Sequence, residues 1–81
     1  MLATAGEFSY PQTVRVSKVG DVYVTDTSGS RVQKFDSEGR FIFQIFIPES
    51  AGSIDDLEID AEGRMLAAFR KANLVLLIEV Q

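Results

Sequence analysis

The sequence predicts an all-β fold of antiparallel strands, organised as two related units. Short runs rich in β-branched and aromatic residues recur along the chain, and such residues suit the pleated surface of a strand. Clusters of Gly, Ser and Asp separate these runs and predict turns. The pattern then repeats at an offset of 43 residues, the spacing of Gly20 and Gly63.

Four strands are predicted in the first unit, and a turn separates each from the next. The residues Thr13 to Ser17 alternate apolar and polar side chains, and a glycine turn leads to the second run, Val22 to Val24. A small polar loop precedes Val32 to Phe35, and a turn at 36–39 precedes Arg40 to Phe46. This order predicts a four-stranded antiparallel meander.

The same stretch resembles the NHL repeat, one blade of a β-propeller. NHL blades carry a proline, a strand, a glycine turn, a strand ending in Asp, a polar loop, a strand with Arg and Gln, and a last turn and strand. The matching positions are Pro11, Val14, Val16, Gly20, the segments 22–26 and 31–35, Asp36, Gly39 and Phe41. The resemblance implies blades stacked around a central channel.

The second unit is expected to be a degenerate copy of this blade. Its predicted strands are Leu57 to Asp60, Arg64 to Phe69 and Leu74 to Val80. Apolar positions coincide with those of the first unit, but Phe69 replaces Asp26 and Leu74 replaces Arg31. The repeat is therefore clearest in the strand pattern and weakest around the polar loop.

We expect one two-blade unit over 1–81, with a first blade at about 12–47 and an incomplete second blade at about 54–81. The last strand of the second blade would lie beyond Gln81, whereas 1–5 lies where a preceding blade would end. Residues 1–5 are therefore expected to complete the blade of a neighbouring copy, and such head-to-tail contacts can close a ring. NHL propellers usually have six blades, so a homotrimer is expected. A tetramer with eight blades, or a natural or engineered fragment of a longer propeller, is the alternative.

The composition favours such association. Hydrophobic residues make up 46% of only 81 residues, and there is no cysteine to form a disulfide. A domain of this size buries only about 60% of the surface that its unfolded chain exposes. The continuous apolar run Val75 to Ile78 is predicted to be buried on both sides, which a blade achieves by stacking between others.

Charge and hydropathy exclude several classes of partner. The net charge of −4 argues against binding to nucleic-acid phosphates. No apolar stretch has the roughly 18–20 residues of a membrane span, and the segment 1–5 lacks the basic start of a signal peptide. The sequence favours a soluble, cytoplasmic protein that binds neither nucleic acid nor membrane.

The polar loop between the second and third strands holds the first group of candidate site residues. In the NHL family, residues at the positions of Asp26 and Arg31 mostly hold this loop, so a structural role is expected for both. The candidate ligand-facing residues are Ser28, Gly29 and Ser30. We expect this loop and the linker 48–53 to face a partner protein or a small ligand.

Asp55, Asp56 and Glu58 form the densest acidic cluster. In propellers the first strand of each blade lines the channel, so a ring would bring copies of Asp55 and Asp56 toward its axis. Oxygen ligands suit Ca²⁺, and related six-bladed lactonases and amidating lyases hold divalent ions in this region. Acidic residues are also ordinary turn residues before a strand. We therefore expect no cofactor, with Ca²⁺ as the alternative.

Catalytic chemistry has little support in the composition. The chain has no histidine to act as a base and no cysteine nucleophile, and its glycines form no phosphate-binding loop. The expected function is a non-catalytic, self-assembling propeller that serves as a binding or interaction scaffold. The alternative is a metal-binding ring or a metal-dependent enzyme of the lactonase or lyase kind.

Overall fold

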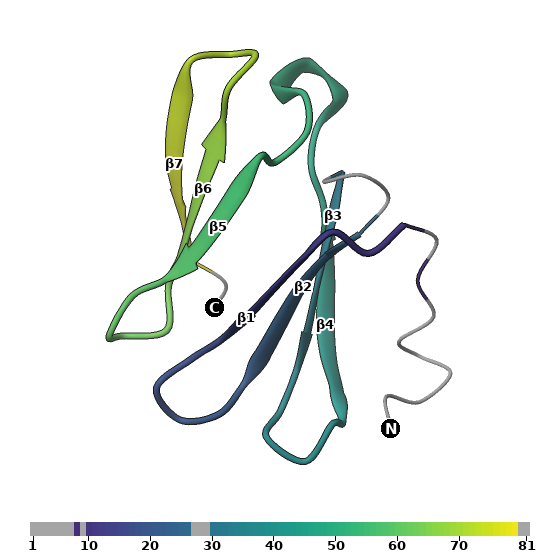
Figure 1. Cartoon of the computed structure of the whole chain (residues 1–81), viewed down its shortest axis with the longest axis vertical. Helices are drawn as coiled ribbons and strands as arrows, with labels where there is room; N and C mark the ends of the chain where they lie inside the picture. The colour runs from purple at the N-terminus through teal and green to yellow at the C-terminus, as the bar shows by residue number, and fades with distance from the viewer. Residues whose placement is uncertain (1–7, 9, 27–29, 80–81) are drawn as a thin grey trace.

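The computed structural model describes residues 8, 10–26 and 30–79, and in this part the fold is all-β (Figure 1). The strands are β1 (Thr13–Val16), β2 (Val22–Asp26), β3 (Arg31–Phe35), β4 (Phe41–Phe46), β5 (Asp56–Ile59), β6 (Met65–Phe69) and β7 (Leu74–Ile78). They form a four-stranded sheet in the order β1-β2-β3-β4 and a three-stranded sheet in the order β5-β6-β7. The predicted all-β fold of antiparallel, blade-like meanders is confirmed.

Four tight turns of one geometry connect neighbouring strands within the sheets. In each turn the backbone N–H of the fourth residue donates a hydrogen bond to the carbonyl oxygen of the first residue. The fourth residue has positive φ in every case, and these residues are Gly20, Gly39, Gly63 and Asn73. Glycine adopts this left-handed conformation without a steric penalty, and asparagine tolerates it better than most residues. The sequence places a permissive residue at all four positions, so the hairpins follow from local chemistry.

Two of these turns share the sequence Asp-x-Glu-Gly-Arg and the same hydrogen bonds. Asp36 accepts the backbone N–H groups of Glu38 and Arg40, each at 2.9 Å, and the Nε–H of Arg40 at 2.7 Å. Asp60 accepts the equivalent N–H groups of the second turn at 3.0 and 2.8 Å, and the Nε–H of Arg64 at 2.7 Å. These short-range bonds fix β4 against β3 and β6 against β5.

The main core lies between the two sheets, where β1 runs beside β5 (Figure 1). Its buried members come from both sheets and from the segment before β5: Tyr23, Val32, Ile54, Leu57, Met65, Ala67 and Phe69. Each large aliphatic side chain buried in this way contributes roughly 1.5–3 kcal/mol. The contact between the sheets is therefore the main source of tertiary stability in the described chain.

The strand β7 exposes apolar surface in the single chain. Its run Val75 to Ile78 is predicted to be buried on both sides when blades stack on both of its faces, and within one chain Val75 is 66% exposed and Leu77 is 48% exposed. Their side chains point away from the first sheet, because Ile78, one residue further along, packs against the core between the sheets. Within the described residues, the opposite side of β7 has no sheet packed on it.

Candidate binding site at the seam of the two sheets

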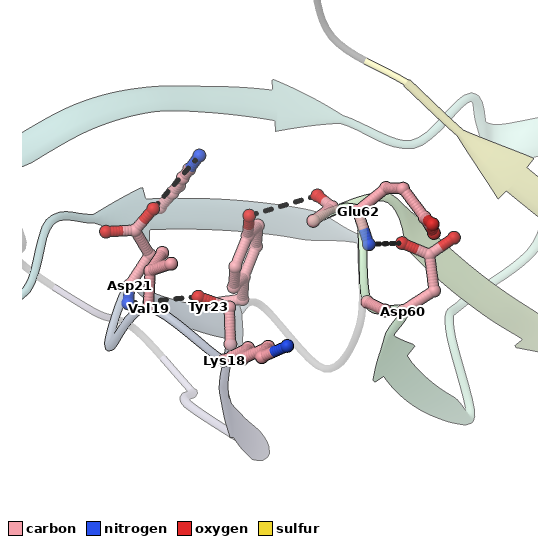
Figure 2. Close-up of a pocket in the computed structure, with 10 residues that line it drawn as sticks. Lys18, Val19, Asp21, Tyr23, Asp60 and Glu62 are labelled. Carbon is pink, nitrogen blue, oxygen red and sulfur yellow. Dashed lines mark hydrogen bonds and ion pairs between the residues drawn. The ribbon is translucent and has the colours of Figure 1, made fainter.

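A polar cavity of about 290 Å³ opens where the β1–β2 turn meets the β5–β6 turn (Figure 2). The stacking of two similar sheets brings these turns together, although they are about 40 residues apart in sequence. The residues that line it are Ser17, Lys18, Val19, Asp21, Tyr23, Lys34, Asp60, Ala61, Glu62 and Gly63. The cavity therefore belongs to both sheets and exists only while they are packed together.

Tyr23 closes the seam beside this cavity. Its hydroxyl donates a hydrogen bond to the carbonyl oxygen of Gly63 at 3.2 Å, and its ring is almost completely buried (Figure 2). The antiparallel register places Lys34 directly across from Tyr23. The Nζ of Lys34 lies 5.2 Å from the centre of the Tyr23 ring and 3.6 Å from Asp21 Oδ2. This ammonium group is held between an aromatic face and a carboxylate, a favourable environment for a cation.

The opposite wall is acidic and fixed in position. Hydrogen bonds from the backbone N–H and the side chain of Arg64 hold the pKa of Asp60 below its usual value, despite partial desolvation. Glu62 lies on the same rim with an exposed side chain, 3.4 Å from Arg64 Nη2. The cavity is thus lined by charges of both signs, which suits a polar or charged group of a ligand.

A second polar cluster secures the start of β1 and the β2–β3 connection. The carboxylate of Asp26 is fully buried, forms an ion pair with Arg31, and accepts the backbone N–H of Tyr10 at 2.8 Å. Arg31 also donates to Gln44 on β4 at 3.3 Å and lies over the ring of Phe46. The two residues predicted to hold this loop are thus joined to each other, to β4 and to the segment before β1.

The loop residues predicted to face a ligand can be placed only in part. Ser28 and Gly29 lie outside the described residues. Ser30 lies at the end of the loop, where its carbonyl oxygen accepts the backbone N–H of Ile47 at 2.8 Å. Ser30 is therefore part of the connection between β3 and the end of β4.

Comparison with known proteins agrees with the geometry of the first sheet. Residues 8–35, which contain β1, β2 and β3, match the family model of the NHL repeat. This segment of the chain is similar to an NHL repeat. The resemblance inferred from the sequence is confirmed over this segment.

Two curated proteins are similar to the chain over a comparable length. One is the B-box type zinc finger protein ncl-1 of Caenorhabditis elegans, 51% identical over 39 residues, which are 48% of this chain and 5% of that protein. The other is the protein brain tumor of Drosophila melanogaster, 49% identical over 39 residues, which are 48% of this chain and 4% of that protein. The chain therefore corresponds to a small part of each relative.

The acidic cluster predicted as a metal site lies beyond the matched NHL repeat, at the start of β5. Asp56 Oδ1 accepts a hydrogen bond from Arg15 Nη2 at 2.9 Å, and Glu58 accepts one from Arg15 Nε at 3.3 Å. Asp55 accepts the backbone N–H of Arg70 at 2.5 Å. Among the described residues, no group of three or more acidic, histidine or cysteine side chains is placed to hold a metal ion. These carboxylates join β5 to its neighbours.

The sequence did not predict the polar cavity between the β1–β2 and β5–β6 turns, which we call the seam cavity. Each of its turns was predicted, but nothing in the sequence pairs Ser17–Asp21 with Asp60–Gly63 across two sheets. The 43-residue repeat was the available signal, because stacked repeats place equivalent turns side by side. The described part of the chain also has no helix long and apolar enough to cross a membrane.

Proposed function

We propose that this chain is a non-catalytic β-propeller scaffold that binds other proteins, with the seam cavity receiving a polar side chain of the partner. The cavity itself is the observation that carries this proposal. Its volume of about 290 Å³ lies just below the range for small-molecule sites, roughly 300–1,000 Å³. A peptide side chain fits such a space better than a larger metabolite does.

Most charged groups of the cavity already have structural partners. Lys34 interacts with Asp21 and Tyr23, and Asp60 is held by Arg64. Groups fixed in this way are preorganised for recognition, because they lose little side-chain entropy when a ligand binds. A general base or nucleophile would instead need a free, correctly protonated group near the reacting atom.

We further propose that copies of the chain assemble into a ring. Three copies would supply six blades, and four copies with eight blades are the alternative. The support is the exposed apolar surface on both sheets, which includes Val14, Val16, Phe46, Val75 and Leu77. Burial of such surface on association is the usual way to stabilise small blades. Native mass spectrometry separates three copies from four, and a monomer at all concentrations contradicts the ring.

A peptide titration followed by NMR tests the binding function. Acidic, basic and neutral tetrapeptides are added to the uniformly labelled chain. We expect chemical-shift changes at Lys34, at Gly63 and in the β1–β2 and β5–β6 turns with at least one class of peptide. Glu62→Lys should reverse the charge preference or weaken binding several-fold. Glu49→Lys makes the same charge change at the separate hollow beside Lys71 and should leave binding unchanged. Absence of shifts at the seam with every peptide would reject the proposal.

A further inference from the structure

Each sheet has two faces, and the contact between the two sheets uses only one face of each. We name as leading faces the surface of the first sheet that carries Arg15, Tyr23 and Val32, and the equivalent surface of the second sheet. The trailing faces are the opposite surfaces. The core between the sheets joins the leading face of the first sheet to the trailing face of the second, which carries Leu57 and Met65.

Each of the two remaining faces carries exposed apolar side chains. On the leading face of the second sheet, Leu66 is 37%, Val75 66% and Leu77 48% exposed. The antiparallel register places these three side chains on one surface, since Leu66 pairs with Leu77, and Val75 with Ala68. On the trailing face of the first sheet, Val14 and Val16 of β1 are 56% and 62% exposed. Further along the same face Val24 and Phe35 are buried, and the ring of Phe8 packs edge-on against Phe35. The chain thus exposes apolar side chains on one leading face and, along β1, on one trailing face.

The 43-residue repeat relates these free faces to the faces that are already packed. Val14 and Val16 are equivalent to Leu57 and Ile59, which pack against the core. Val75 is equivalent to Val32, a fully buried residue of the same core. The leading face of the second sheet in one copy can therefore pack on the trailing face of the first sheet in another copy, as the two sheets pack on each other within one chain.

The charges beside β1 and β5 favour the same arrangement. Inside the chain, Arg15 lies between Asp56 and Glu58. Arg15 in the first blade and Glu58 in the second blade occupy equivalent positions of the 43-residue repeat. If the internal packing is repeated between chains, Glu58 of one copy faces Arg15 of the next. The exposed pair has opposite charges, so it favours this orientation over one that brings like charges together.

We propose that a second copy of this chain docks the trailing face of its first sheet, with Val14 and Val16, on the leading face of the second sheet, with Leu66, Val75 and Leu77. The inference rests on the proposed self-assembly and adds to it the interface and its direction. The contact is heterologous, so every copy uses two different surfaces. An isologous dimer would instead bring one face against itself.

Two arginine substitutions on exposed positions test this arrangement. Val75→Arg blocks the leading face, and Val16→Arg blocks the trailing face. Ala72→Arg adds the same charge at the exposed β6–β7 turn and is the control. Sedimentation velocity over a wide range of concentration gives the mass of each variant and of an equimolar mixture, and far-UV circular dichroism checks that each variant retains β-structure.

The heterologous contact predicts a specific set of masses. Val75→Arg and Val16→Arg should each be monomeric, whereas Ala72→Arg should assemble like the unmodified chain. Mixing the two blocked variants should give a one-to-one dimer and nothing larger, because the mixture holds one intact pair of faces. An unfolded variant could not produce this gain of association.

Other results separate the two proposals. If the unmodified chain assembles and Val75→Arg still does so to the same extent, self-assembly stands and this interface is wrong. If the blocked variants are monomeric but never form the mixed dimer, the head-to-tail direction is wrong. If the unmodified chain stays monomeric at every concentration, both the ring and this interface are rejected, while the peptide-binding function is unaffected.

Discussion

The hydroxyl of Tyr23 donates a hydrogen bond to the carbonyl oxygen of Gly63 and so joins the β2 strand of one sheet to the β5–β6 turn of the other. The ring of Tyr23 also belongs to the core between the sheets and lines the seam cavity. One residue therefore couples the stability of the two-sheet unit to the shape of its candidate binding site.

Tyr23→Phe removes this hydrogen bond and keeps the ring. We expect the free energy of unfolding to fall by about 1 kcal/mol, the usual net contribution of one such bond. Urea unfolding followed by circular dichroism measures the change. Tyr10→Phe removes a hydroxyl from a 70% exposed side chain and is the matched control. Equal effects of the two substitutions would show that the bond to Gly63 contributes nothing.

Leu57→Ala and Leu66→Ala compare the packed and free faces of the second sheet by the same chemical change. Leu57 is fully buried and Leu66 is 37% exposed. We expect Leu57→Ala to cost about 2–5 kcal/mol and Leu66→Ala clearly less, measured at concentrations where the chain is monomeric. Similar losses would contradict the placement of the core between the sheets.

Asp26→Asn removes one charge of a buried pair and leaves Arg31 without its carboxylate. We expect a loss of roughly 3 kcal/mol, because an uncompensated buried charge is costly. Arg15→Ala breaks the exposed pairs with Asp56 and Glu58 and should cost at most about 1 kcal/mol. Thermal and urea unfolding of both variants measure the contrast, and an equal cost would mean that the Asp26 cluster is hydrated.

Acid should destabilise the two Asp-x-Glu-Gly-Arg turns. Hydrogen bonds from Arg40 and from Arg64 hold the pKa of Asp36 and of Asp60 below the ordinary value of 3.8. Their stabilising contribution is therefore complete above about pH 4 and is lost as the pH falls through the lower folded pKa. Asp60→Asn should flatten the dependence of Tm on pH in this acidic range, whereas Glu49→Gln should not. An unchanged profile in Asp60→Asn would show that this turn does not contribute.

Calcium provides a test of the acidic cluster at β5. Arg15 already neutralises Asp56, and the backbone N–H of Arg70 engages Asp55, so a cation would compete with these contacts for both carboxylates. We expect no change of Tm with millimolar Ca²⁺. A rise in Tm that is lost in Asp55→Ala or Asp56→Ala would support the metal-binding alternative.

The sequence predicted the strands well because their signals are local. Val22 to Val24 and Val32 to Phe35 have the residue types of strands, and the turns between strands carry glycine or asparagine where positive φ is required. The apolar run of β7 predicts burial on both sides in stacked blades, but periodicity cannot say how many neighbours a blade has within one chain. The seam cavity depends on the distance between two sheets, which no run of residues encodes by itself.

The four similar turns also bear on how the chain folds. Each turn closes its hydrogen bonds within four or five residues, so its loop-closure entropy is small. Hairpins can therefore form early and separately, before Tyr23 reaches Gly63 across 40 residues. The slow step of folding should then be the docking of the two preformed sheets, and substitutions in the core between them should affect the folding rate most.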